Sequence, residues 1–205
     1  PFSNADGPLY AWSRQSNGDT APRLYGVDRR TGAVLWRTRM ASAANVSGPW
    51  GDGDFAYGAV VERSNWTLVA VDARTGARRW AAPLATFDAK RPDDAAEITD
   101  VVSVGGVVVA AVQDSAHDEQ SRLMAVAAGA VRWRRQLLNP IIAASPDGRL
   151  FAASFDSRLH ELDTATGSSL WSVDTSGPVD RLTVTPTMLI TSMGRSTTGY
   201  RLPVR

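Results

Sequence analysis

Histidine, cysteine and clustered carboxylates build most catalytic and metal-binding sites, and this sequence of 205 residues offers few of them. It contains no cysteine, which excludes disulfide bonds, thiolate metal sites and cysteine nucleophiles. Its two histidines, His117 and His160, are far apart in the sequence, whereas a zinc site needs three or four clustered ligands. No Ser-His-Asp arrangement and no Gly-x-Ser-x-Gly motif accompanies them. We therefore expect no catalytic residue and no metal ligand, and we interpret His160 as a packed or surface residue of a strand.

One acidic motif, Gly51-Asp52-Gly53-Asp54, has the oxygen-rich composition that calcium prefers. No Glu follows at the position that would close an EF-hand loop. Similar Asn/Asp-Gly chemistry recurs at Ser16-Asn17-Gly18-Asp19 and at Pro146-Asp147-Gly148, and such residues favour tight turns. We interpret all three motifs as turns before strands.

The charge and hydropathy patterns exclude two classes of partner. The formal net charge is +1, and the basic residues are spread along the chain rather than clustered as a nucleic-acid footprint requires. No apolar run is long enough to span a membrane. Because the chain begins with Pro1 instead of Met, we expect a processed or trimmed form, and an upstream signal peptide or anchor is compatible with it.

A short pattern recurs four times, and each copy ends in Trp. The copies run from Leu24 to Trp36, from Leu68 to Trp80, from Leu123 to Trp133 and from Leu159 to Trp171. The third copy is two residues shorter than the others and has lost the Asp. The Trp residues are about 45 residues apart on average, which is the length of one propeller blade.

The repeat predicts a β-hairpin. An alternating strand is followed by Asp-x-x-Thr-Gly, in which the Asp carboxylate can accept backbone N–H groups and Gly supplies a positive φ, and a second strand ends at the Trp. A lone hairpin cannot bury its faces, so the copies must stack. A Trp at the same place in each copy can wedge between neighbouring sheets and bury about 200 Å².

A further pair of strands precedes each hairpin, such as 98–104 with 107–113. We therefore predict an all-β fold, a β-propeller of four-stranded antiparallel blades with about five blades in a single domain, 1–205. The first blade lacks its innermost strand and the last lacks its outermost strand. Two arrangements stay open: a five-bladed ring closed by residues 1–6, or part of a larger ring. The expected blades are 9–47, 48–92, 97–139, 140–176 and 178–205.

The hairpin resembles the repeat of the PQQ-type (pyrroloquinoline quinone) propeller family, Ala-x-Asp-x-x-Thr-Gly-x-x-x-Trp. The second copy matches it fully, with Ala70, Asp72, Thr75, Gly76 and Trp80. The first and fourth copies match except at the Ala position, where Gly26 and Glu161 stand, and the third copy keeps only the end of the motif. In this family the signature residues dock neighbouring blades and do not bind the quinone. The resemblance therefore implies a docking role for Asp28, Gly32, Trp36, Asp72, Gly76, Trp80, Gly129, Trp133, Asp163, Gly167 and Trp171.

The resemblance also separates branches of the family. Its members include PQQ- and calcium-dependent dehydrogenases, a periplasmic scaffold lipoprotein of the outer-membrane β-barrel assembly machine, and extracytoplasmic sensor or accessory domains. The dehydrogenases resemble much longer, eight-bladed rings with a disulfide between adjacent cysteines, and this chain has neither feature. The resemblance thus implies a scaffold or sensor without a cofactor, located outside the cytoplasm.

Two polar loops of the third blade break the pattern of short turns. They span residues 86–97 and 114–120, and propeller geometry would place both on one face, where they concentrate negative charge. Loops on a rigid scaffold commonly carry function, so we expect a docking site for an unidentified protein or a cation-binding patch here; solvated insertions are the alternative. Trp66, beside a turn, is a further candidate for an exposed contact. The candidate loop residues are Asp88, Asp93, Asp94, Glu97, Asp114, Asp118 and Glu119.

Three functional hypotheses follow. The first is a non-catalytic scaffold or sensor that binds another protein. The second is a relative or fragment of a PQQ- and calcium-dependent dehydrogenase, which only the repeat motivates. The third is a carbohydrate- or cell-wall-binding propeller, which the turn-rich faces with Trp50 and Trp66 motivate.

Overall fold

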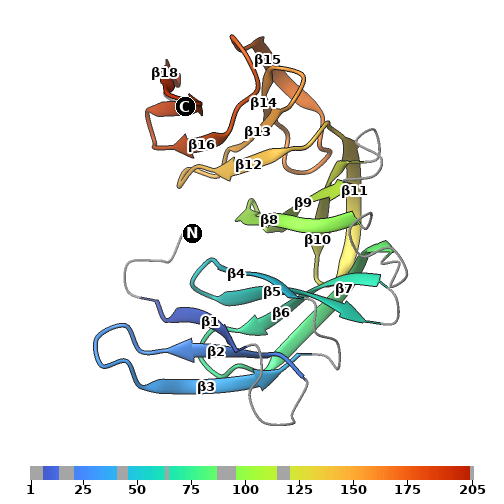
Figure 1. Ribbon diagram of the computed structural model, residues 1–205, viewed down its shortest axis with the longest axis vertical. Coiled ribbons are helices and arrows are strands. Elements are labelled where there is room, and N and C mark those ends of the chain that lie inside the picture. Colours follow the sequence, from blue (N-terminus) through green and yellow to red (C-terminus); the bar gives the residue numbers. More distant parts are fainter. Residues whose placement is uncertain are drawn as a thin grey trace. The chain divides into compact units, whose positions relative to one another are not determined.

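In the computed structural model the chain folds into β-strands joined by turns (Figure 1). The structure describes residues 7–13, 21–40, 46–62, 65–86, 96–114 and 121–203. Within these ranges the strands form five antiparallel sheets, and no helix is long and apolar enough to cross a membrane. The chain divides into two compact units, residues 1–101 and 102–205, which are described in turn.

The first unit contains sheets 1 and 2. Sheet 1 has three strands in the order β1-β2-β3, and sheet 2 has four in the order β4-β5-β6-β7. Their bounds are β1 Leu9–Ser13, β2 Arg23–Val27, β3 Val34–Arg39, β4 Val46–Gly51, β5 Phe55–Glu62, β6 Asn65–Asp72 and β7 Arg78–Thr86.

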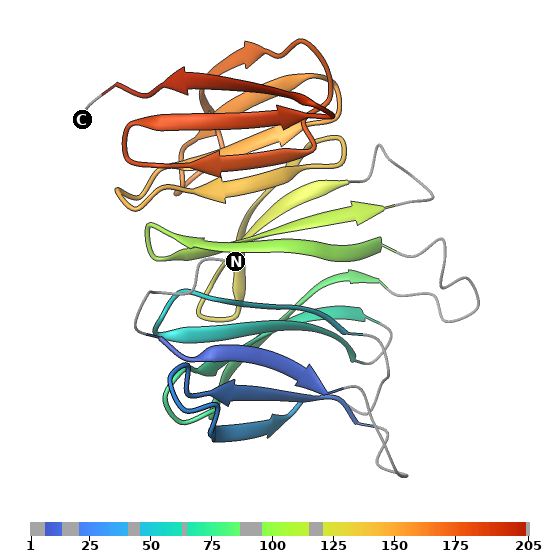
Figure 2. The ribbon, with the colours of Figure 1, turned by 60° about the vertical axis from the view of Figure 1, so that its left-hand side comes forward.

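The second unit contains sheets 3, 4 and 5, and the boundary between the units falls within β8. Sheet 3 has the order β11-β10-β9-β8, sheet 4 the order β12-β13-β14-β15, and sheet 5 the order β16-β17-β18, drawn in red in Figure 2. The bounds are β8 Ala96–Val104, β9 Val107–Asp114, β10 Arg122–Ala127, β11 Ala130–Gln136, β12 Ile141–Ala144, β13 Leu150–Ser154, β14 Arg158–Leu162, β15 Ser169–Asp174, β16 Arg181–Val184, β17 Met188–Met193 and β18 Ser196–Arg201.

Each sheet is a meander in which consecutive strands are neighbours, and in sheets 1 to 4 the repeat hairpin supplies the last two strands. In sheet 2, for example, the hairpin is β6–β7, and β4 and β5 are the pair that precedes it. Sheets 1 and 5 have three strands each among the described residues: sheet 1 has no strand before β1, and sheet 5 has none after β18. These are the two positions where the sequence predicts missing strands.

The hydrophobic cores lie between the faces of neighbouring sheets. In the first unit Leu24 and Trp36 of sheet 1 pack with Val60 and Val69 of sheet 2. In the second unit Trp133 of sheet 3 packs with residues of sheet 4, and Phe151 of sheet 4 packs with residues of sheet 5. The middle strands β6 and β10 are buried on both faces, so most of their residues are apolar and do not alternate with polar ones.

The Asp-x-x-Thr-Gly turn has the geometry that its residue types predict. In the second copy Asp72 Oδ1 accepts hydrogen bonds from the backbone N–H of Arg74 (3.1 Å) and from the backbone N–H (2.9 Å) and hydroxyl (2.9 Å) of Thr75. Gly76 closes the turn at φ 70°, a conformation that favours glycine. The third copy lacks the Asp and instead turns through Ala128 (φ 50°) and Gly129 (φ 83°), two residues that both have a positive φ.

Candidate functional site

The repeat Trp of sheet 1 lies on the Asp-x-x-Thr-Gly turn of sheet 2, and the repeat Trp of sheet 3 lies on the turn of sheet 4. In the first unit the Trp36 indole Nε1–H donates to the Ala73 carbonyl at 2.7 Å, and the Thr38 hydroxyl donates to the Gly76 carbonyl. In the second unit the same contacts recur two repeats later, between sheets 3 and 4. Trp133 donates to the carbonyl of Thr164 at 2.9 Å, and Arg135, two residues after Trp133, donates to the carbonyl of Gly167 at 2.9 Å. The turns therefore present backbone acceptors to a Trp and to the side chain two residues after it.

Glycine at the end of the turn makes room for the indole. A Cβ on Gly76 would lie 2.7 Å from the Trp36 ring, and a Cβ on Gly167 would lie 2.6 Å from the Trp133 ring. Both glycines also have a positive φ, 70° and 74°. The signature Gly thus serves the turn and the contact between sheets at the same time.

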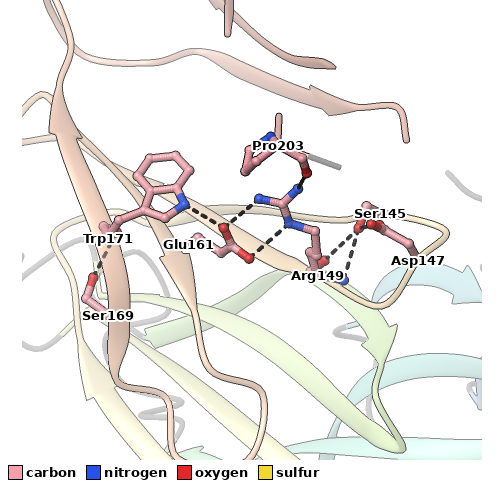
Figure 3. A network of polar contacts seen from close by, with 7 residues as sticks. All are labelled: Ser145, Asp147, Arg149, Glu161, Ser169, Trp171 and Pro203. Carbon is pink, nitrogen blue, oxygen red and sulfur yellow. Dashed lines mark hydrogen bonds and ion pairs between the residues drawn. The ribbon is translucent and has the colours of Figure 1, made fainter. Parts of the chain in front are cut away.

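The fourth repeat uses a different acceptor for its Trp (Figure 3). Trp171 Nε1–H donates to the Glu161 carboxylate, and Arg149 makes a bidentate contact to the same carboxylate, with Nε at 2.9 Å and Nη2 at 2.7 Å. Arg149 also donates to the carbonyl of Pro203 at 3.3 Å, and its guanidinium lies 5.2 Å from the centre of the Phe151 ring. Glu161 stands where the signature has Ala, so the departure from the repeat has a structural reason.

The Arg149–Glu161 pair is deeply buried. Its side chains are 1% and 3% exposed. The hydrogen bonds with Glu161 raise the pKa of Arg149. Removal of either member of such a pair would leave the other charge buried and unpaired. Sequence reasoning did not identify Arg149, because nothing in the turn Pro146-Asp147-Gly148 before it signals a partner on β14.

An acid on β8 and an indole on β4 form a second polar contact, in the first unit. Asp100 accepts hydrogen bonds from the backbone N–H of Val101 (2.9 Å) and from the Trp50 side chain. Burial raises the pKa of Asp100, and the two hydrogen bonds oppose that shift. Neither residue was expected to pair, because β4 and β8 belong to different repeats. The indole N–H of Trp50 is thus engaged with a carboxylate.

The predicted partner-binding residues lie for the most part outside the described residues. This holds for Asp88, Asp93, Asp94, Asp118 and Glu119, while the described part of the chain includes the backbone of Asp114 as the last residue of β9. Glu97, the second residue of β8, is exposed. Since β8 and β9 are consecutive antiparallel strands, the start of β8 and the end of β9 lie at the same end of sheet 3.

The expectation of an exposed Trp66 is wrong. Trp66 lies in β6, is 6% exposed and is paired with Val61 and Ala85 in the neighbouring strands. Because β6 is the third of four strands and is covered on both faces, an aromatic residue there belongs to the core. Trp66 therefore offers no surface for a partner or a sugar.

The remaining polar candidates have local structural partners. Asp52 closes its turn by accepting hydrogen bonds from Asp54 N (3.1 Å), Phe55 N (2.9 Å) and the Tyr57 hydroxyl (2.6 Å). His160 is buried beside the Ser169 hydroxyl, 3.0 Å from its Nδ1, and burial followed by the charge of Arg135 lowers the pKa of the imidazole. In the described ranges no three His, Cys, Asp or Glu side chains converge as metal ligands.

Comparison with known proteins identifies the family. The family model described as "Outer membrane protein assembly factor BamB" matches residues 6–116 and 119–198, which include nearly all of the chain. No curated protein sequence matches significantly.

Three solved structures show the same fold at low sequence identity. BamB from Moraxella catarrhalis superposes with a TM-score of 0.64 at 22% identity, over 97% of this chain and 56% of that protein. The quinohemoprotein alcohol dehydrogenase ADHIIG from Pseudomonas putida HK5 has a TM-score of 0.60 at 18% identity, over 91% of this chain and 37% of that enzyme. The computationally designed protein Ika8 has a TM-score of 0.62 at 13% identity, over 97% and 66% of the two chains.

This chain therefore spans little more than half the length of the M. catarrhalis protein that it resembles. The fold class predicted from the repeat is confirmed, because all five sheets are antiparallel sheets of propeller-blade type and the family model matches along the chain. The chain belongs to the PQQ-type repeat β-propeller family whose model is described as outer membrane protein assembly factor BamB.

Proposed function

We propose that the chain is a non-catalytic scaffold or sensor module that acts outside the cytoplasm and binds another protein through acidic loops at one end of sheet 3. The observation that carries the proposal is the position of the strand ends from which these loops depart. The segments 86–97 and 114–120 are joined to the start of β8 and to the end of β9, and these ends are neighbours. Acidic residues outnumber Lys and Arg in the two segments. The basic residues are Lys90 and Arg91, and the acidic residues are Asp88, Asp93, Asp94, Glu97, Asp114, Asp118 and Glu119.

The charge of these segments is local. The whole chain has a net charge of +1, so an excess of acid at one sheet end is compensated elsewhere. A concentrated negative potential accelerates and orients the approach of a positively charged surface. We therefore propose a partner that presents a basic patch.

The structural hydrogen bonds of the other polar side chains support a scaffold function. The carboxylates of Asp28, Asp72 and Asp163 accept hydrogen bonds within their own turns. Arg149 pairs with Glu161 inside sheet 4, and His160 is hydrogen-bonded to Ser169. Each of these groups takes part in a structural hydrogen bond. The family description, an assembly factor, is a further reason to propose a binding role and an extracytoplasmic location.

The experiment is an affinity capture from an envelope extract of the source organism. One bait is the chain itself, and the other carries Asp93→Asn, Asp94→Asn, Asp118→Asn and Glu119→Gln. A matched control removes four exposed acids elsewhere, with Asp54→Asn, Asp147→Asn, Asp156→Asn and Asp174→Asn. The proposal predicts a protein that the native and control baits retain and the loop variant loses.

Two other outcomes have distinct meanings. Retention by all three baits would keep a protein-binding function but remove the loops from it. Capture of no protein, together with uptake of PQQ in the presence of calcium by the purified chain, would replace the scaffold with a relative of the quinoprotein dehydrogenases.

A further inference from the structure

The imidazole of His160 lies in the contact between sheets 3 and 4. Alternation along β14 places His160 on the same face as Leu162, and its partner across the β13–β14 pair is Ala152. Leu162 and Ala152 both belong to the core cluster that contains Trp133 of sheet 3. His160 is 6% exposed, so a proton taken up by its imidazole would place a charge inside the contact between the two sheets.

Arg135 reaches the same contact from sheet 3. It follows Trp133 by two residues on β11 and therefore points to the same face of the strand. Its Nη1–H donates to the Gly167 carbonyl at 2.9 Å, and the His160 Nδ1 lies 3.0 Å from the Ser169 hydroxyl. Gly167 and Ser169 are separated by one residue, so the guanidinium and the imidazole meet the same short segment at the start of β15.

Three charged groups among the described residues act on His160. They are Arg135 of β11, Arg158 of β14 and Asp156 in the turn between β13 and β14. Burial, followed by the charge of Arg135, lowers the pKa of His160. Arg158, which pairs with Asp174 of β15 at 3.3 Å, acts in the same direction, whereas Asp156 raises the pKa. Arg135 is thus the charged group with the strongest effect on the imidazole.

The Arg135 guanidinium is only partly hydrogen-bonded. Its Nη1 donates to Gly167, but its Nε is buried and has no hydrogen-bond partner in the part of the chain that the structure describes. A buried donor without a partner costs free energy. The side chain is therefore the part of this contact that moves most easily when a second positive charge forms beside it.

We propose that His160 is a proton-sensitive switch of the contact between sheets 3 and 4. When His160 takes up a proton, the imidazolium and the guanidinium repel each other, the Arg135 side chain leaves the Gly167 carbonyl, and the turn of residues 163–168 separates from sheet 3. The Ser169 hydroxyl remains bonded to His160, because a hydroxyl oxygen accepts from a protonated Nδ1. This switch is separate from the acidic loops of the proposed function.

The lowered pKa of His160 determines the direction of the pH dependence. In the open form the imidazole has its ordinary pKa of about 6.5, and in the closed form the pKa is lower. The neutral imidazole thus favours the closed contact, which is fully stable above about pH 6.5 and loses stability as the pH falls through about 6.5 toward the pKa of the closed form. The contact is therefore closed at neutral pH and opens in mildly acidic solution.

The first measurement is amide hydrogen exchange of the full chain, followed by NMR at pH 7.5 and pH 5.5 and corrected for the intrinsic exchange rate at each pH. We expect the protection factors of residues 164–169 to fall by about fivefold or more at pH 5.5, and those of β17 in sheet 5 to stay constant. His160→Gln takes up no proton in this range and should abolish the fall.

The second measurement is NMR titration of the His160 imidazole in variants that keep the histidine. Arg135→Gln removes the facing cation and should raise the pKa of His160 toward its ordinary value. Arg134→Gln is the matched control, because Arg134 carries the same charge but is exposed on the opposite face of β11. It should leave the titration of His160 unchanged.

Three results would overturn the proposal. The first is equal protection of residues 164–169 at the two pH values in the native chain, or a fall of the same size in His160→Gln. The second is an equal pKa of His160 in Arg135→Gln and Arg134→Gln, because the guanidinium would then not act on the imidazole. The third is a parallel fall in the protection of β17, because the opening would then be global.

Discussion

Glu161 lies directly opposite Trp171 in the antiparallel pair β14–β15 and accepts the hydrogen bond of its indole. In the other three repeats the position across from the Trp is occupied by a small residue, Gly26, Ala70 or Ala125. A small residue leaves room for the ring, whereas Glu161 supplies an acceptor and brings a charge that Arg149 must neutralise. The fourth blade therefore combines the repeat hairpin with a buried ion pair.

Removal of one member of this pair should be strongly destabilising. Glu161→Ala leaves the Arg149 guanidinium buried without its carboxylate, and such a change costs about 3–5 kcal/mol of unfolding free energy. Urea unfolding followed by Trp fluorescence measures it. The double variant Arg149→Met, Glu161→Leu should recover most of the loss, because no buried charge is then left unpaired.

An exposed ion pair of the same unit is the matched control. Arg158 and Asp174 are 3.3 Å apart with side chains 57% and 83% exposed, so Arg158→Ala should cost less than about 1 kcal/mol. Equal losses for Glu161→Ala and Arg158→Ala would contradict a structural role for the buried pair.

The signature glycines should differ in their tolerance of a methyl group according to whether an indole covers them. Gly76→Ala adds a Cβ 2.7 Å from Trp36 to a positive φ, so we expect it to lower the unfolding free energy by about 3 kcal/mol or more. Gly32→Ala has the same φ and an open space, and should cost about 1 kcal/mol from backbone strain alone. Thermal and urea unfolding of the two variants provide the comparison, and equal losses would mean that the contact with the ring is unimportant.

Acid should weaken the turns. Hydrogen bonds from Thr31 to Asp28, from Arg79 and Thr75 to Asp72, and from Thr166 to Asp163 lower the pKa of these carboxyl groups. Because a lowered folded-state pKa favours the folded protein only where the unfolded group is ionised, this stability is present above about pH 4 and is lost as the pH falls through the folded-state values.

The triple variant Asp28→Asn, Asp72→Asn, Asp163→Asn should melt at a lower temperature than the parent at pH 7. It should also lose less stability than the parent between pH 5 and pH 2. Melting temperatures measured by circular dichroism at pH 7 and between pH 5 and pH 2 test both expectations. If the melting temperatures of the two proteins fell equally with pH, these carboxylates would not stabilise the turns.

The pKa of Asp100 should depend on the hydrogen bond from Trp50. Since the hydrogen bond from Trp50 favours the charged carboxylate, Trp50→Phe should raise the pKa of Asp100 further above its ordinary value. Carbon-13 NMR titration of the carboxyl group measures the change. Trp12→Phe removes another indole of the same unit and should leave the titration of Asp100 as it was; an identical shift in both variants would rule out a specific bond.

The repeat hairpins and the incomplete first and last sheets were predictable from the sequence, because the signals are local. Asp, Thr and Gly at fixed offsets determine the turn, and alternation before Trp36, Trp80 and Trp171 determines the strands. The turn of the third repeat was recognisable as a repeat only through Gly129 and Trp133. It folds as a shorter turn because Ala128 and Gly129 both adopt a positive φ.

The polar contacts between strands were not predictable, because they join residues that no spacing rule connects. Arg149 follows a turn and Glu161 lies in a strand, and each is unremarkable by itself. Trp66 was misjudged for a related reason: its neighbour Asn65 suggested a surface turn, but β6 is covered on both faces and buries the ring. Arg149 meets Glu161 because β13 pairs with β14, and the Trp66 ring is buried because β6 is covered on both faces.

The most direct measurement of the proposed function is the equilibrium binding of a captured partner to the purified chain at two salt concentrations. We expect the affinity for the native chain to fall by about tenfold between 50 and 300 mM salt, because surface charges are screened over this range. The loop variant with Asp93, Asp94, Asp118 and Glu119 neutralised should bind at least about tenfold more weakly at low salt and show little salt dependence. Equal affinities of the native chain and the loop variant at both salt concentrations would contradict the assignment of the acidic loops as the docking site.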